Sequence, residues 1–144
     1  MSIIVKFFMA PDDASAATTV GAGPGPAFTS LSFGNFDAEE AVVEWECLFS
    51  GGRFEDLLEA GEPRIVGGED DDGCVVFALS ARLVDALAEA EPSRLDEVGA
   101  QWARQRAEDG EPIDPDVARE MVGSLGALAR GTEEHGRGLY CWIA

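Results

Sequence analysis

The pattern of apolar and polar positions is most regular in the second half of the chain. Residues 74–79 form a short apolar run that predicts a buried strand. Ser80 follows as the N-cap of a helix over 81–90, because its hydroxyl can accept a hydrogen bond from a free backbone N–H. Helical spacing returns over 92–109 and 115–130, and both patterns open on a proline, which is tolerated in a first turn. We therefore expect a strand followed by three helices.

Glycines and polar residues mark the ends of these elements. Gly110 and Gly131 stand where C-caps are expected, because glycine readily adopts the left-handed conformation that terminates a helix. Only a short link separates the last two helices, which predicts a C-terminal helical hairpin. The polar residues 132–138 predict a loop, and 139–143 predict a last strand whose alternate side chains face opposite sides.

The first half of the chain opens on another apolar run. Residues 3–9 are apolar at nearly every position, which is typical of a central strand covered on both faces. Residues 28–36 alternate between apolar and polar and predict a short strand. Asp37, with Glu40 three positions later, has the spacing of a capping box and predicts the start of a helix.

Three shorter segments complete the predicted fold. Residues 54–60 predict a short helix and 64–66 a short strand, whereas 14–20 are at most weakly helical. The elements together predict an α+β fold in a single domain over residues 1–144. We expect a small mixed sheet in which the N-terminal and C-terminal strands lie close together, with about four to five helices covering one face.

The charge is the most unusual property of the composition. The chain carries 28 acidic and 10 basic residues, which gives a formal net charge of −18 at pH 7. Residues 1–73 hold 15 of the acids and only three of the bases. Such a surface repels nucleic-acid phosphates and anionic lipids, so we expect neither nucleic acid nor a membrane as partner. It would attract a basic protein, although an acidic composition can also serve solubility alone.

Acidic side chains in the first half are the candidate contacts for a basic partner. They lie on the predicted helix after Asp37 and in the loop before the clearest strand: Glu39, Glu40, Glu44, Glu69, Asp70, Asp71 and Asp72. The loop lacks a calcium motif, because an EF-hand register with Gly73 as its glycine requires an acid at Gly68 and a glutamate at Leu79. We therefore expect no metal site and treat the loop as a solvated connection.

The sequence carries no catalytic signature. Its single histidine, His135, excludes sites that need two, including the H-E-x-x-H zinc class. The glycine-rich segment 21–26 lacks the Gly-Lys-Ser/Thr of a phosphate loop, and no G-x-S-x-G occurs. We expect no catalytic residue and no cofactor. The alternative is a small-molecule-binding protein or enzyme with an acidic and aromatic pocket, for which Trp45, Trp102 and His135 are the candidate lining.

Residue usage favours the cytoplasm of a bacterium. The apolar opening is too short for a signal peptide and follows no basic region, and no apolar stretch approaches the length of a membrane span. The three cysteines, Cys47, Cys74 and Cys141, are odd in number, widely spaced and set among apolar neighbours, which indicates buried free thiols in a reducing compartment. Nine of the ten basic residues are arginine, which is typical of a GC-rich bacterial genome.

The order of elements resembles that of a known family. An apolar start, Met-Ser-Ile-Ile-Val-Lys-Phe-Phe, precedes an acidic middle, and a strand at 75–77, a helix over 81–90 and a helix opened by Leu95 follow. The chain closes on a strand that contains Leu-Tyr-Cys-Trp at 139–142. In this order it is similar to the bacterial YfbM-type family of small cytoplasmic proteins. The resemblance implies a mixed α+β fold and carries over no catalytic residues.

These observations favour a binding function over an enzymatic one. A strongly acidic chain without catalytic motifs is typical of a protein-binding or regulatory module, of the inhibitor or immunity type, that recognises a basic protein.

Overall fold

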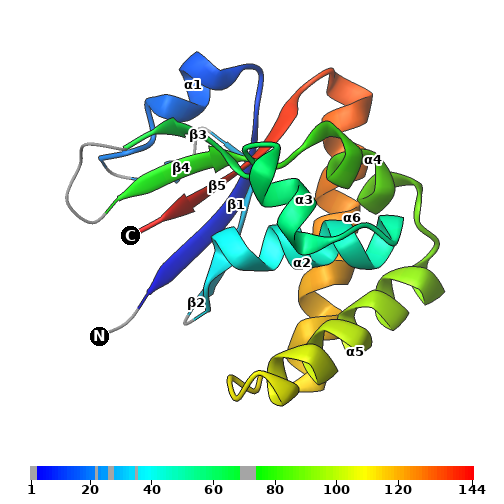
Figure 1. Cartoon of the computed structure of the whole chain (residues 1–144). Helices are drawn as coiled ribbons and strands as arrows, with labels where there is room; N and C mark the ends of the chain where they lie inside the picture. Colours follow the sequence, from blue (N-terminus) through cyan, green and yellow to red (C-terminus); the bar gives the residue numbers. More distant parts are fainter. Residues whose placement is uncertain (1–2, 22, 26–27, 35, 69–73) are drawn as a thin grey trace.

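The structure is a computed structural model that describes residues 3–21, 23–25, 28–34, 36–68 and 74–144, and only the backbone of His135. Its described residues form five strands and six helices (Figure 1). The strands are β1 (Ile4–Ala10), β2 (Ser30–Gly34), β3 (Arg64–Gly67), β4 (Val75–Ala78) and β5 (Gly138–Ile143). The helices are α1 (Asp13–Ala17), α2 (Ala38–Ser50), α3 (Phe54–Glu59), α4 (Ala81–Glu89), α5 (Pro92–Glu108) and α6 (Pro115–His135).

One sheet in the order β2-β1-β5-β4-β3 organises the fold. The predicted α+β class is confirmed, and so is the proximity of the first and last strands, because β1 pairs directly with β5 and places Val5 opposite Ile143. The C-terminal helical hairpin is also confirmed. α5 and α6 pack against each other as antiparallel neighbours, since Gly99 lies against Arg119 and Leu95 against Gly126.

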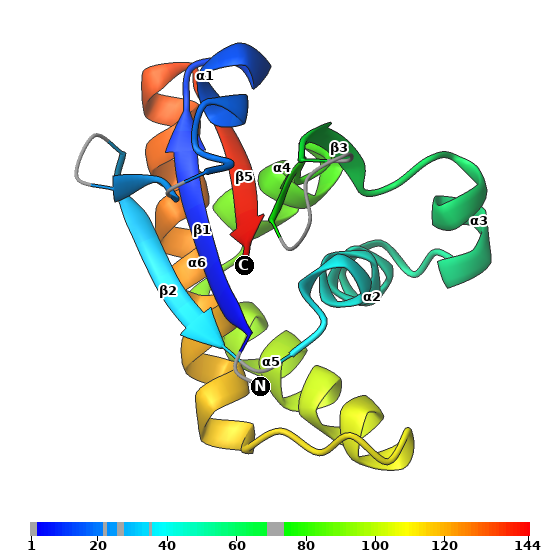
Figure 2. The same cartoon turned by 90° about the vertical axis from the view of Figure 1, so that its left-hand side faces the viewer.

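Both faces of the sheet are covered, and the three central strands divide their side chains between them. Phe7 of β1, Phe77 of β4 and Cys141 of β5 point into the larger core, which α2, α4, α5 and α6 complete. Their neighbours Phe8 and Trp142 point to the opposite face, into a smaller core that includes Ala16 of α1. In Figure 2, α6 runs behind β1, against which it packs. The alternation of side chains along a strand explains why these strands are apolar at almost every position.

The prediction of a mixed sheet is wrong, because every neighbouring pair of strands is antiparallel. The direction of β5 follows from the lengths of the helices before it. α4 and α5 carry the chain away from the end of β4, and α6 returns it over 21 residues, about 31 Å at 1.5 Å per residue. The chain re-enters where β4 left, and the Leu79 N–H donates to the Leu139 carbonyl there. The strand that follows must therefore run antiparallel to β4.

The prediction of four to five helices on one face also needs correction, because α1 forms a sixth helix on the other face. Asp12 caps it by accepting a hydrogen bond from the Ser15 N–H at 2.8 Å. Asp13 then accepts one from the Tyr140 hydroxyl of β5 at 2.8 Å and pairs with Arg64 of β3. The segment is short and alanine-rich, so its helix depends on these contacts with the sheet rather than on an apolar stripe of its own.

The predicted end of α6 at Gly131 is also wrong. The helix continues to His135 because the face beyond Gly131 is still buried: Thr132 is fully buried, and its hydroxyl donates to the Ala129 carbonyl. Gly131 instead provides room for Met9 of β1, whose Cε would lie 3.3 Å from an added Cβ. The left-handed residue that ends the helix is Gly136, with φ of 63°.

Gly99 sets the distance between α5 and α6. A Cβ at this position would lie 2.6 Å from the Arg119 Cα and 3.0 Å from the Ala118 carbonyl oxygen. Backbone atoms of a packed helix cannot move aside as a flexible side chain can, so the close approach of the helices requires glycine here.

We expect Gly99→Ala to lower the free energy of unfolding by about 2 kcal/mol, because the added methyl group forces α5 away from α6. Gly123→Ala is the matched control, since an added Cβ in α6 meets nothing within 4 Å. That variant should gain up to about 1 kcal/mol from better helix propensity. Urea unfolding followed by tryptophan fluorescence measures both, and equal effects would contradict the close packing at Gly99.

Candidate functional site

An open groove of about 1020 Å³ lies between the β2–α2 connection, the end of α5 and the start of α6. Its lining is apolar for the most part, with acidic side chains from two separate segments. The larger apolar side chains are Ile3, Phe33, Phe36, Trp102, Ile113, Val117, Met121 and Ile143. The acidic ones are Asp37, Glu39, Glu111 and Asp114.

Aromatic packing builds the wall of the groove behind Phe36. Its ring meets Trp102 edge to face with centroids 5.9 Å apart, and Trp102 in turn meets Trp45 at 5.1 Å. Both tryptophans are fully buried, whereas Val117, near the start of α6, leaves 45% of its surface exposed. The groove therefore has a rigid aromatic wall and an aliphatic wall that contacts solvent.

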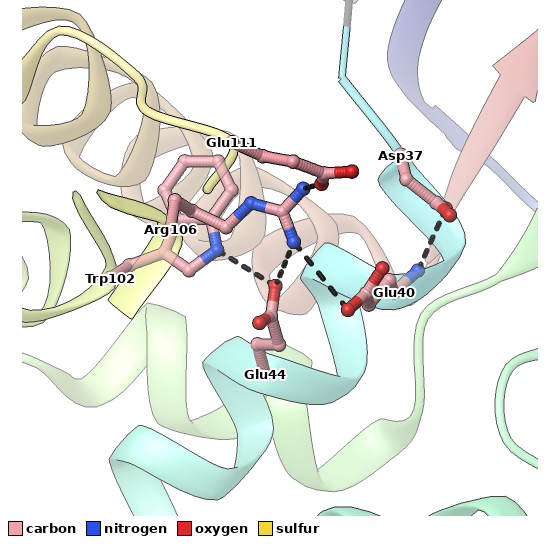
Figure 3. A network of polar contacts seen from close by, with 6 residues as sticks. All are labelled: Asp37, Glu40, Glu44, Trp102, Arg106 and Glu111. Atoms are coloured by element: carbon pink, nitrogen blue, oxygen red, sulfur yellow. Dashed lines mark hydrogen bonds and ion pairs between the residues drawn. The ribbon is translucent and has the colours of Figure 1, made fainter. Parts of the chain in front are cut away.

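A buried arginine in the lining of the groove holds a network of polar contacts together (Figure 3). Arg106 on α5 is only 5% exposed, and its Nη1 lies 3.3 Å from a Glu44 oxygen and 3.5 Å from a Glu40 oxygen. Its Nη2 donates to Glu111, which follows α5. The same Glu44 oxygen accepts a hydrogen bond from Trp102 Nε1 at 3.1 Å. One guanidinium thus connects α2, α5 and the α5–α6 connection.

Burial is the largest influence on the pKa of Glu44. Removal from water raises the pKa of this carboxyl above its usual range, while the hydrogen bond from Trp102 and the charge of Arg106 act in the opposite direction. Breaking a buried pair by removing one partner is strongly destabilising, because it leaves the other charge uncompensated.

Three of the four acids that line the groove, all except Glu111, have no ion-pair partner among the described residues. Asp37 and Asp114 are exposed and cap α2 and α6, where they accept hydrogen bonds from backbone N–H groups. Glu39 is half-buried and forms no ion pair with any described residue. Burial and the negative charge of Asp37 raise the pKa of Glu39. The rim is therefore negative, and the only base among the described lining residues is the enclosed Arg106.

The structure brings together only part of the residues predicted for a site. Glu39 lines the groove, while Glu40 and Glu44 bind Arg106 behind it. Of the predicted pocket residues, Trp102 lines the groove, but Trp45 lies in the core and packs behind the lining rings of Phe36 and Trp102. His135 ends α6, about 27 Å along the helix from Val117, so it does not join them. The predicted contacts Glu69, Asp70, Asp71 and Asp72 lie outside the described residues.

Arg106, Ile113 and Val117 were not among the predicted site residues. Arg106 does leave a signal in the sequence, because it follows Trp102 by four positions and so continues the buried stripe of α5 with a charge. A charged residue at a buried helical position indicates a partner of opposite sign. The sequence does not indicate which of its many acids is that partner.

The cysteines provide no reactive thiol beside the groove. All three are unbonded, as predicted, but only Cys141 is buried, whereas Cys47 and Cys74 are half-buried. Burial raises the pKa of Cys141, and burial with the nearby carboxylates of Glu46 and Glu44 raises that of Cys47. Both shifts oppose formation of the thiolate, which is the nucleophilic form.

Comparisons with family models, with curated proteins and with solved structures give no match for this chain. The resemblance to the YfbM-type family therefore stays a prediction. None of the described helices combines the length and apolar character that a membrane span requires. Within the described ranges, no three His, Cys, Asp or Glu side chains are grouped so that they could hold a metal ion.

We expect Glu44→Ala to lower the free energy of unfolding by about 3 kcal/mol, because it leaves the Trp102 N–H unpaired and removes a buried partner of Arg106. Glu44→Gln keeps an acceptor for Trp102 and should lose about 1 kcal/mol. Glu134→Ala, on an exposed position at the far end of α6, is the control and should change little. Equal losses for the two Glu44 variants in urea unfolding would show that the Trp102 hydrogen bond contributes nothing.

Proposed function

We propose that this protein is a non-enzymatic binding protein, of the inhibitor or immunity type, whose groove holds a basic protein in the bacterial cytoplasm. The observation that carries the proposal is the division of charge at the groove. Asp37, Glu39 and Asp114 line it without an ion-pair partner among the described residues. The one described base of the lining, Arg106, is buried and already neutralised by Glu44 and Glu111. A cationic surface would find carboxylates there and no competing cation.

The net charge of the chain supports the same partner. A charge of −18 accelerates the approach of a basic protein over distances of about a Debye length, and the rim then directs it to the groove. Rim charges act mainly on the association rate and lose their effect as salt is added. The chain would in this way combine long-range attraction with a defined contact site.

A small cationic amphiphile is the second candidate ligand. The groove volume of about 1020 Å³ lies near the upper end of the range for small-molecule sites, and the lining combines apolar walls with a few carboxylates. An organic amine with an apolar body would meet the same chemistry as a basic protein does. This candidate differs from the first because it needs no macromolecular partner.

Tagged protein with matched charge variants tests the proposal in a lysate of the source organism. At low salt, the wild type should retain a basic protein in stoichiometric amount and release it at high salt. Glu39→Lys should lose at least ten-fold in retention, because it places a cation at the rim. Glu134→Lys changes the net charge equally at an exposed site away from the groove and should lose less than two-fold. Equal losses, or no retained protein at low salt, would contradict the proposal.

Binding of the retained protein should also weaken as the pH falls. Ionised Glu39 attracts the partner, and its raised pKa means that it becomes protonated at a higher pH than an ordinary glutamate does. Asp37 and the buried Cys141 thiol are the titratable groups that interact with it electrostatically. In Glu39→Gln, the part of the affinity loss that comes from protonation of Glu39 should be missing. Affinity measured by calorimetry between pH 7 and pH 4 checks this, and identical profiles would exclude a role for Glu39.

A further inference from the structure

We propose that the groove anchors one apolar side chain of its partner, and that lysine or arginine residues next to this anchor meet the unpaired carboxylates of Asp37, Glu39 and Asp114. This inference rests on the proposed function and specifies the segment of the basic partner that enters the groove. It treats the groove as a recognition site for a short sequence pattern rather than as part of a generally acidic surface.

The need for an apolar anchor follows from the walls. Val117 is 45% exposed, and Ile113 and Phe33 beside it in the lining are half-buried, so their apolar surface is in contact with water. Phe36 and Trp102 form the wall behind them and are held by edge-to-face packing. Purely electrostatic attraction would leave this apolar surface wet. An aliphatic or aromatic side chain that enters the groove would cover it, as anchor residues do at protein interfaces.

The need for flanking cations follows from the positions of the carboxylates. Asp37 and Glu39 come from the start of α2, and Glu111 and Asp114 come from the α5–α6 connection. Glu111 already binds Arg106, which also contacts Glu40 of α2. The lining carboxylates without an ion-pair partner among the described residues are therefore Asp37, Glu39 and Asp114. Basic residues that flank the anchor would meet these three carboxylates.

The state of the buried arginine argues against an acidic ligand in the groove. A carboxylate-bearing ligand would need Arg106, but that side chain is 5% exposed and already binds Glu44, Glu40 and Glu111. Glu39, by contrast, is partly desolvated and without an ion-pair partner among the described residues. A cation placed beside Glu39 would relieve the unfavourable burial of its charge. The groove therefore selects cationic over anionic segments.

Three capped synthetic peptides test the pattern with the full-length protein: Lys-Lys-Leu-Lys-Lys, Lys-Lys-Ser-Lys-Lys and Glu-Glu-Leu-Glu-Glu. Calorimetry at one salt concentration should give at least ten-fold tighter binding for the leucine peptide than for the serine peptide, and none for the acidic peptide. Equal affinity of the two basic peptides would overturn the anchor while leaving the proposed function intact. Failure of both basic peptides, with no basic protein retained from lysate, would overturn the inference and the proposed function together.

Two matched variants test whether the apolar lining of the groove, rather than its charge, causes the preference for leucine over serine. Val117→Ser removes exposed apolar surface from the groove and should reduce the preference for leucine over serine at least five-fold. Leu58→Ser is the control, because Leu58 on α3 is 49% exposed and lies outside the groove lining. An unchanged preference in Val117→Ser would overturn the assignment of the anchor to this groove. Binding of hexylamine, with no binding of either basic peptide, would overturn it in favour of a small amine ligand.

Discussion

The groove and its surroundings depend on the neutralisation of one buried guanidinium. Arg106 stands on the inward face of α5, where a charge without partners would be strongly unfavourable. Two glutamates of α2 and one from the α5–α6 connection supply the compensating charge, and the Trp102 N–H completes the hydrogen bonding of Glu44. Because these groups come from three segments, their mutual contacts fix how α2 stands against α5. The position of α2 in turn places Asp37 and Glu39 at the rim.

The same arrangement explains why the groove combines apolar surface with negative charge. Arg106 binds the buried Glu44 and the more exposed Glu40 and Glu111. The acids that cap helices or stand alone, Asp37, Asp114 and Glu39, keep their charge at the groove because none of them pairs with Arg106. The rings of Phe36 and Trp102 pack edge to face and lie between the main core and the groove. Apolar surface and negative charge are therefore adjacent at the groove.

Local rules predicted the parts of this structure that depend on neighbouring residues in sequence. Asp37, Ser80 and Asp114 cap their helices as their positions indicate, and the apolar strands are central because both of their faces are covered. The antiparallel direction of β5 was not predictable in this way, because it depends on the combined path of three helices. The pairing of Arg106 with Glu44 joins residues 62 positions apart, and a chain with 28 acids offers no means of choosing among them. The groove itself exists only where α2, α5 and α6 meet.

The position of β5 between β1 and β4 has a consequence for the order in which the chain can acquire its structure during synthesis. β1 and β2 can pair early, and β3 and β4 form a second antiparallel pair. No strand joins these two pairs until residues 138–143, which form β5, leave the ribosome. The contacts that unite the sheet, such as Val5 with Ile143, span almost the whole chain, and contacts of such separation form slowly. A nascent chain that stops before Gly138 therefore exposes two unpaired strand edges, which are the parts of a sheet most prone to aggregation.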